Sequence, residues 1–223
     1  MSASKPREIT TTQQGVHDKL DELVARYQQS ENRRPVSDHT RQTFEQATDW
    51  LNGWQGDIIL DSCCGVGEST ARLAASHPDA RVIGLDKSEA RLGKHEHYRQ
   101  QADNYAVFRA DVNDFWRLVK DAQWAVSKHY LLYPNPYPKS SQVQKRWHAS
   151  AAFVDMMGIT SHVEVRSNWL IYLLEFAQAA KHYGVISDLQ SISDGEAFTP
   201  FERKYRGSGQ TCWKLLCQSE ESA

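Results

Sequence analysis

The chain has 223 residues, of which 40% are hydrophobic and 24% charged, and its 26 basic and 28 acidic side chains leave a formal net charge of −2. The 7 Trp, 9 Tyr and 7 Phe residues exclude a disordered chain, because such chains lack the apolar surface that a core needs. The balanced charge gives no overall attraction to nucleic acid, so any RNA or DNA contact must come from a local basic patch.

The N-terminal residues 1–15 are polar, and we expect them to be mobile. They lack the apolar segment of a signal peptide, and the longest apolar run, residues 169–174, is too short to cross a membrane. The 4 cysteines form no CxxC pair, and His95 and His97 would face different sides of a helix. We therefore expect a cytoplasmic protein without a metal site, membrane contact or disulfide framework.

Two amphipathic helices are predicted next. Apolar residues recur at helical spacing from Val16 to Tyr27, ahead of the break that Pro35 makes. The second helix has an apolar stripe from Phe44 to Trp54, and glycines mark its end.

After residue 56, short apolar runs alternate with longer helical stretches, which indicates βαβ units around a mostly parallel sheet. The predicted strands are 57–61, 81–86, 105–109, 124–133, 163–167, 185–188 and 211–218. Gly207 and Gly209 precede the last run and predict a terminal hairpin, which would insert one antiparallel strand. The expected fold is α/β, a doubly wound, mostly parallel seven-stranded sheet with an N-terminal helical extension.

The first strand ends at Asp61 and leads into a turn that contains Gly65 and Gly67, followed by a helix. Such a turn lets backbone N–H groups approach a ligand, and Asp86, at the end of the next strand, is placed to accept ribose hydroxyls. A lone Gly-x-Gly is more often only a tight turn. The strand, the helix and the downstream acid together favour adenosine binding.

A dinucleotide is the first competitor, but Thr70 occupies the position where the Rossmann fingerprint needs Gly or Ala. Asp61 would repel a pyrophosphate, whereas it could accept a hydrogen bond from an ammonium group. The segment resembles motif I of class I S-adenosylmethionine-dependent methyltransferases, with Cys63 where that pattern usually has its first Gly. The resemblance implies S-adenosylmethionine as cofactor and a Rossmann-like domain over residues 56–223, preceded by an arm and helices in residues 1–55. It also places Asp111 near the adenine amino group, although Asp111 could equally be a helix N-cap.

The fourth strand leads into Tyr133-Pro134-Asn135-Pro136-Tyr137-Pro138-Lys139, where three prolines stiffen the backbone. The following residues include Lys145, Arg146 and Trp147. Cations interleaved with aromatics are typical of phosphate contact and base stacking, while a solvated loop is the simpler alternative.

These residues resemble the D-P-W-P-K…K-R-R stretch of the bacterial tRNA (guanine-N7)-methyltransferase family. Ser167-Asn168-Trp169 resembles its T-D-W, and Thr199-Pro200-Phe201-Glu202 resembles its T-x-[FY]-E. The resemblance covers residues 57–217 and implies methylation of tRNA at guanine N7. It implies the following site residues: cofactor contacts Asp61, Gly65, Gly67, Asp86 and Asp111, catalytic residues Asn135 and Glu202, and substrate contacts Lys139, Arg146, Asn168 and Thr199.

Two departures leave alternatives open. Both family aspartates are replaced by Asn, at Asn135 and Asn168, and the loop from Ser140 to Gln144 carries fewer cations than the family's. An Asn-Pro loop is also similar to the N-P-P-[YF] motif of amino methyltransferases, so an exocyclic amine or a small molecule is a rival substrate. A non-catalytic relative that binds cofactor or RNA is the other rival. Whether the chain is a monomer or a homodimer is left open.

Overall fold

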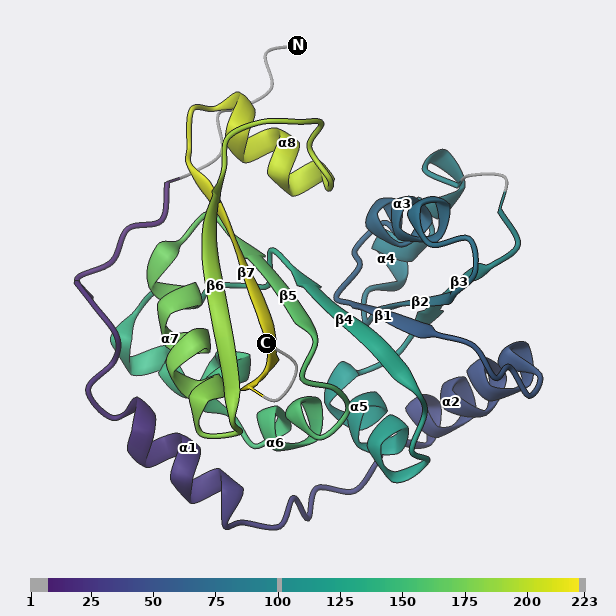
Figure 1. Cartoon of the computed structure of the whole chain (residues 1–223), viewed down its shortest axis with the longest axis horizontal. Coiled ribbons are helices and arrows are strands. Elements are labelled where there is room, and N and C mark those ends of the chain that lie inside the picture. Colours follow the sequence, from purple (N-terminus) through teal and green to yellow (C-terminus); the bar gives the residue numbers. More distant parts are fainter. Residues whose placement is uncertain (1–7, 100–101, 221–223) are drawn as a thin grey trace.

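The computed structural model describes residues 8–99 and 102–220 (Figure 1). Within these ranges seven strands form one sheet. They are β1 (Ile58–Ser62), β2 (Arg81–Asp86), β3 (Tyr105–Arg109), β4 (Val126–Leu132), β5 (Val163–Ser167), β6 (Val185–Ile192) and β7 (Cys212–Ser219). Each coincides with a predicted strand to within a few residues at either end.

The sheet has the strand order β3-β2-β1-β4-β5-β7-β6. The first five strands in this order are parallel, and β7 lies antiparallel between β5 and β6. The predicted doubly wound, mostly parallel α/β fold is therefore confirmed. Strand order reverses between β1 and β4, and a sheet of this kind binds ligands outside the carboxyl ends of the strands at such a point.

Helices cover both faces of the sheet. The α-helices are α1 (Leu20–Gln28), α2 (Asp38–Leu51), α3 (Glu68–Ser76), α4 (Glu89–Leu92), α5 (Val112–Asp121), α6 (Ala152–Met157), α7 (Leu170–Lys181) and α8 (Pro200–Gly207). The short 3-10 helices of the described residues are η1 (His95–His97), η2 (Ser140–Lys145) and η3 (Trp147–Ala149). No helix in the two described ranges is long and apolar enough to cross a bilayer.

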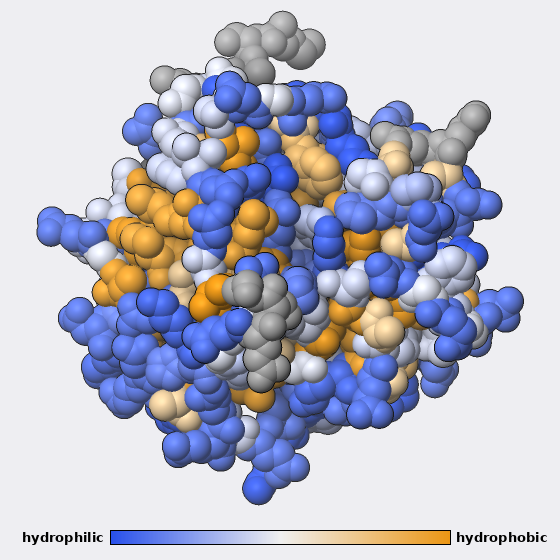
Figure 2. Space-filling view, in the orientation of Figure 1, coloured by the Kyte–Doolittle hydropathy of each residue, from blue (hydrophilic) through white to orange (hydrophobic). Residues whose placement is uncertain are grey.

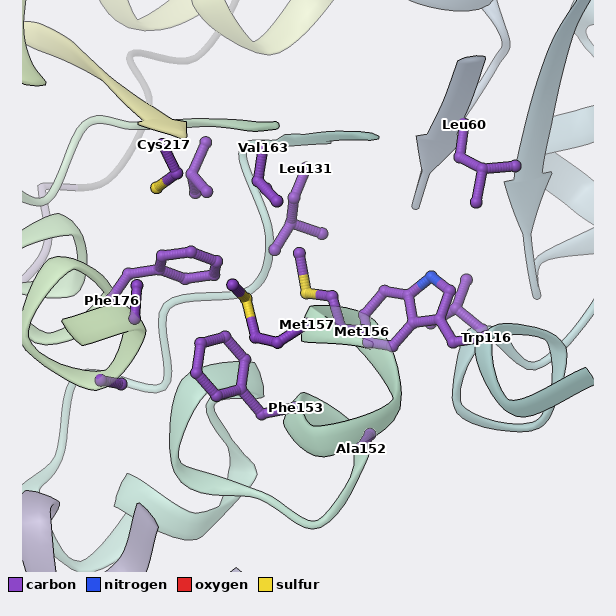
Figure 3. Close-up of a cluster of buried hydrophobic side chains, with 14 of the residues drawn as sticks. Leu60, Trp116, Leu131, Ala152, Phe153, Met156, Met157, Val163, Phe176 and Cys217 are labelled. Atoms are coloured by element: carbon purple, nitrogen blue, oxygen red, sulfur yellow. The ribbon is translucent and has the colours of Figure 1, made fainter. Parts of the chain in front are cut away.

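The larger core lies between one sheet face and helices α5, α6 and α7 (Figure 3). Leu131 and Val163 project from the sheet toward Trp116, Phe153 and Phe176 of these helices. Leu73 and Ala74 of α3 pack with Ile59 and other residues in the smaller cluster. The alternation of Ile59 and Leu60 between the two clusters is the period-two pattern of a strand buried on both faces.

The two N-terminal helices belong to the larger core. Leu20 and Leu23 of α1 and Ala47 of α2 are buried within it. Ser37 caps α2 by accepting a hydrogen bond from Thr40 N–H, and the helix ends at Asn52, which adopts a left-handed φ of 46°. Because the chain leaves the helix there, the prediction that the helical stripe extends to Trp54 is wrong. The domain boundary at residue 55 stays a prediction.

The connection between β6 and β7 differs from the predicted tight hairpin. The two strands pair antiparallel over Val185–Ile192, but α8 lies between them in the chain, at the far end of the ribbon that they form (Figure 1). Thr199 caps α8 by accepting a hydrogen bond from Glu202 N–H, and Pro200 stands in its first turn, where a missing N–H costs nothing. Of the two glycines that suggested the turn, Gly207 is the last residue of this helix and Gly209 follows it.

Candidate active site

A cavity of about 640 Å³ lies at the carboxyl ends of the parallel strands. It has a first end formed by residues that follow β1, β2 and β3: Cys63, Asp86, Lys87, Arg91, Ala110, Asp111, Val112 and Asn113. Its second end is formed by residues from the β4 and β5 exits and from α8: Tyr133, Pro134, Asn135, Pro136, Tyr137, Gln144, Lys145, Trp147, Ser150, Asn168, Phe201 and Tyr205. Of the predicted site residues, Asp86, Asp111, Asn135 and Asn168 line this cavity.

The turn after β1 has left-handed backbone at Cys63, Gly65 and Gly67, with φ of 62°, 63° and 75°. A Cβ on Gly67 would lie 2.5 Å from the Nδ1 of His95, so only glycine fits there. A Cβ on Gly65 would meet nothing within 4 Å, which leaves open space beside its backbone. His95 Nδ1–H donates to the Val66 carbonyl at 2.9 Å and holds the turn from outside. Nothing in the sequence pointed to this histidine.

Asp61 is completely buried behind the turn. Its Oδ2 accepts hydrogen bonds from the hydroxyls of Ser69 and Thr70, both at 2.7 Å, while Oδ1 has no partner among the described residues. Burial raises the pKa of Asp61 to about 6, against the lowering effect of the two hydroxyls. A buried, unpaired carboxylate oxygen is the acceptor that an ammonium group requires.

Asp86 connects the turn to the following segment. Its Oδ2 accepts a hydrogen bond from Gly65 N–H at 3.0 Å, and its Oδ1 accepts one from Ser88 N–H at 2.7 Å. Arg91 lies 3.3 Å from Oδ1. The carboxylate thus fixes the glycine turn and also borders the cavity, where a ribose could bind to it.

Asp111 is the N-cap of α5, the alternative role that the sequence left open, and it also lines the cavity. Its Oδ1 accepts hydrogen bonds from Asn113 N–H and Nδ2, which caps α5. Its Oδ2 accepts a hydrogen bond from Arg34 at 3.2 Å. The predicted contact with an adenine amino group stays a prediction.

These features fit S-adenosylmethionine. Asp86 at the end of β2 lines the cavity, Gly65 leaves open space beside its backbone, and Asp61 lies buried behind the turn with one carboxylate oxygen unpaired. One feature departs from the expected turn: Cys63, which lines the cavity, adopts a backbone angle that favours glycine.

The proline-rich loop carries Asn135 to the second end of the cavity. Asn135 is exposed, and its Oδ1 accepts a hydrogen bond from Tyr137 N–H at 3.4 Å. Asn168, beyond β5, donates from Nδ2 to Gln210 Oε1 at 2.8 Å. Lys139 is exposed outside the residues that line the cavity. The sequence resemblance had indicated both asparagines, and the fold brings them to one wall.

Arg146 is not placed to hold phosphate, as the sequence had suggested. It is completely buried, and all three guanidinium nitrogens donate within the chain. Nη1 contacts both oxygens of Glu175 at 2.7 and 2.6 Å, while Nε and Nη2 donate to the Tyr137 carbonyl. His148 Nε2 lies 2.9 Å from the same carboxylate. Arg146 therefore shapes the loop from inside.

The N-terminal segment is held by the same buried cluster. Gln13 donates to Glu175 at 2.6 Å and accepts from Arg146 at 3.0 Å, and His17 N–H donates to Glu175. Thr11 donates its hydroxyl hydrogen to the Pro138 carbonyl. The expectation of a mobile arm is therefore corrected from Thr11 onward, and residues 1–7 lie outside the described residues.

Glu202 and Thr199 also stand apart from the cavity lining. Glu202 is buried and accepts hydrogen bonds from the Tyr133 hydroxyl and from Arg166, both at 3.0 Å. Thr199 is buried as the N-cap of α8. The predicted direct contact of Glu202 with a substrate is corrected accordingly: the carboxylate reaches the cavity only through Tyr133, which lines it. No group of three or more His, Cys, Asp or Glu suited to a metal occurs in residues 8–99 and 102–220.

The sheet and the glycine turn have the arrangement of the class I methyltransferase fold. A structure described as an antibiotic-related methyltransferase superposes with a TM-score of 0.56 at 12% identity, over 83% of this chain and 96% of that one. A variant of the 16S rRNA (adenine(1408)-N(1))-methyltransferase of Catenulisporales acidiphilia gives a TM-score of 0.55 at 11% identity, over 81% and 93%. At identities this low, the structural similarity shows that the folds are alike and nothing more.

The family follows from the sequence comparison. The model of a family described as "Putative methyltransferase" matches residues 55–215. A tRNA (guanine-N(7)-)-methyltransferase of Saccharophagus degradans is 23% identical over 74% of this chain and 77% of its own length, and one of Shewanella amazonensis is 24% identical over 76% and 75%. The chain belongs to this methyltransferase family, and the predicted S-adenosylmethionine-dependent class is confirmed.

Replacing Cys63 by glycine should tighten cofactor binding, because this residue lines the cavity and glycine suits its left-handed backbone and leaves more space there. We expect the dissociation constant for S-adenosylmethionine, measured by calorimetry, to fall about fivefold, or about 1 kcal/mol. Cys64→Ala is the control, since Cys64 is buried and does not line the cavity. Unchanged or weaker binding by Cys63→Gly would show that the thiol does not obstruct the cofactor.

Cofactor affinity should also fall in mild acid. The pKa of Asp61 is about 6, and a bound ammonium group favours the ionised carboxylate. Protonation of Asp61 below pH 6 therefore opposes binding, and we expect about tenfold weaker affinity at pH 5 than at pH 7. Calorimetry between pH 5 and pH 7 should show this change of affinity with pH in the wild type and no such change in Asp61→Asn. An equally strong pH dependence in the variant would mean that another group titrates.

Proposed function

We propose that this cytoplasmic enzyme methylates N7 of a guanine in tRNA. One observation carries the proposal: the residues that follow β4 and β5 in the family-like motifs, Asn135 and Asn168, line the same cavity as Asp86. The end proposed for the cofactor and the end proposed for the substrate therefore belong to one cavity. The curated relatives with the names given above support the choice of tRNA and of guanine N7.

The residues at the substrate end suit this reaction. Guanine N7 has a lone pair and no proton to remove, so the reaction needs alignment more than a general base. S-adenosylmethionine, when bound, supplies an electrophilic methyl group. Asn135 and Asn168 can orient the base through amide hydrogen bonds, and an amide needs no ionisation to do so.

The cofactor end has a separate role. Asp61 and Asp86 would hold the ammonium group and the ribose, and Gly65 gives the backbone room to approach them. At the outer edge of the loop, the exposed Lys139 and the cavity-lining Lys145 are available for phosphate contact, which is the role that the buried Arg146 cannot perform.

An unmodified tRNA transcript tests the proposal directly. Incubation with tritium-labelled cofactor should place label in the RNA, and mass analysis of its nucleosides should show N7-methylguanosine. Label in another nucleoside, or no label in any tRNA tested, would contradict the proposed reaction.

An exocyclic amine is the second candidate, because Asn135 presents an amide oxygen in an Asn-Pro loop. Asn135→Asp distinguishes the two. At guanine N7 a carboxylate stabilises the positive charge that develops on the purine, so the variant should raise kcat by about threefold to tenfold. Steady-state kinetics on tRNA measures this. A strongly reduced kcat would favour the amine, whose hydrogens need the amide oxygen and its neighbouring carbonyl.

A further inference from the structure

Phe201 is an exposed aromatic residue at a place where exposure needs a reason. Three large hydrophobic side chains are exposed in the described part of the chain: Trp54 at 36%, Leu174 at 38% and Phe201 at 42%. Leu174 lies on α7, over which hydrophobic residues gather on the face shown in Figure 2. Of the three, Phe201 alone lines the cavity.

Phe201 stands in a series of three aromatic rings. Tyr205 follows it by one helical turn on α8, with ring centroids 6.4 Å apart and planes at 23°, so the two rings are stacked. Tyr205 in turn lies 5.7 Å from the ring of Tyr133, at 39°. All three rings line the cavity, and they form one aromatic wall on its substrate side.

Hydrogen bonds to buried Glu202 hold the aromatic wall in position. The Tyr133 hydroxyl donates to Glu202 at 3.0 Å, and Arg166 donates to the same oxygen. Glu202 also belongs to α8, the helix that carries the other two rings. Glu202 is therefore a positioning residue that fixes the helix and Tyr133 relative to each other, which explains its burial away from the cavity lining.

The charge at this end of the cavity suits a nucleobase. Its polar lining consists of Asn135, Asn168, Gln144, Ser150 and Lys145, whereas the carboxylates of the lining belong to the first end. A flat, neutral and electron-rich ring is compatible with aromatic faces and amide groups, and a cation at the rim favours its phosphate. An anionic small molecule would gain little from the aromatic faces.

We propose that Phe201 and Tyr205 form the surface on which the target purine of the RNA stacks, with its edge toward Asn135 and Asn168. The inference rests on the proposed function and names the part of the site that selects a flat base. Stacking on an aromatic side chain tolerates any base. The rings of Phe201 and Tyr205 would therefore hold the plane of the base, and the amides of Asn135 and Asn168 would recognise the hydrogen-bonding groups along its edge.

Variants at Phe201 test this surface without disturbing the fold, because the side chain is exposed. Phe201→Ala should lower kcat/KM for tRNA by about 10-fold to 100-fold while leaving the dissociation constant for S-adenosylmethionine unchanged. Phe201→Tyr should retain activity near that of the wild type. Phe201→Leu keeps apolar area without an aromatic face, so it should resemble Phe201→Ala. Leu174→Ala is the matched control, and it should behave as the wild type.

A second measurement is independent of catalysis. A single-stranded RNA carrying 2-aminopurine, whose fluorescence is quenched by stacking, should be quenched by the wild type and less by Phe201→Leu. Equal quenching by both proteins, or full activity of Phe201→Leu on tRNA, would overturn the stacking surface. A wild-type protein that quenches the probe but transfers no methyl group to tRNA would instead overturn the proposed function and leave the stacking surface supported.

Discussion

Glutamine in place of Glu175 should lower the free energy of unfolding by about 3–5 kcal/mol, because the substitution leaves a buried guanidinium without its counter-ion. Glu175, Arg146 and His148 are all completely buried. Burial by itself raises the pKa of Glu175, but hydrogen bonds from His148 and Arg146 outweigh it and hold that pKa near 2. The carboxylate is thus ionised at neutral pH, and its loss is the loss of a charge.

The effect should reach the active site. Arg146 donates to the Tyr137 and Lys139 carbonyls, and Glu175 also accepts from Gln13 and His17. Removing the carboxylate therefore loosens both the loop that carries Asn135 and the N-terminal segment. We expect KM for tRNA to rise while the affinity for S-adenosylmethionine changes little.

Urea denaturation measures the stability, and a surface pair provides its control. Glu31 pairs with Arg33 at 3.2 Å with both side chains largely exposed, so Glu31→Gln should change stability by less than about 1 kcal/mol. A stability of Glu175→Gln within about 1 kcal/mol of the wild type would show that the buried guanidinium does not depend on this counter-ion.

The strands and their mostly parallel arrangement could be predicted because their signals are local and repeated. Ile58 to Ser62 is buried at every position, as is usual for a central parallel strand, and the helical stretches between such runs imply crossovers. The inserted strand β7 was also foreseen. The helix that connects β6 to β7 was not predicted, because α8 is short and highly charged and the glycines at its end look like a hairpin turn.

The site could be predicted where a backbone feature determines function. Gly67 and Asp86 are required by the turn itself, so their pattern survives in the sequence. Arg146 shows the opposite case. A cation in a basic loop looks the same whether it faces solvent or a buried carboxylate, and its partner Glu175 stands 29 residues away on α7. Long-range pairing of this kind leaves no local periodicity.

Asparagine in place of Asp86 should weaken S-adenosylmethionine binding about 100-fold. The carboxylate accepts from Gly65 N–H and from Ser88 N–H, one on each oxygen. The amide of Asp86→Asn would present a donor toward one of these N–H groups, so the glycine turn would lose an anchor, and a ribose would lose a charged acceptor. Hydrogen bonds to charged groups contribute about 1.5–3 kcal/mol each, which corresponds to the expected loss.

Calorimetric titration with the cofactor checks this, alongside a thermal melt to establish that the variant is folded. Asp79→Asn is the matched control, since Asp79 is exposed in the turn between α3 and β2 and does not line the cavity. An Asp86→Asn protein that is folded and binds the cofactor within about threefold of the wild type would mean that this carboxylate serves only the turn. In that case the ribose must bind elsewhere along the first end of the cavity, where Asp111 would be the acid left to accept its hydroxyls.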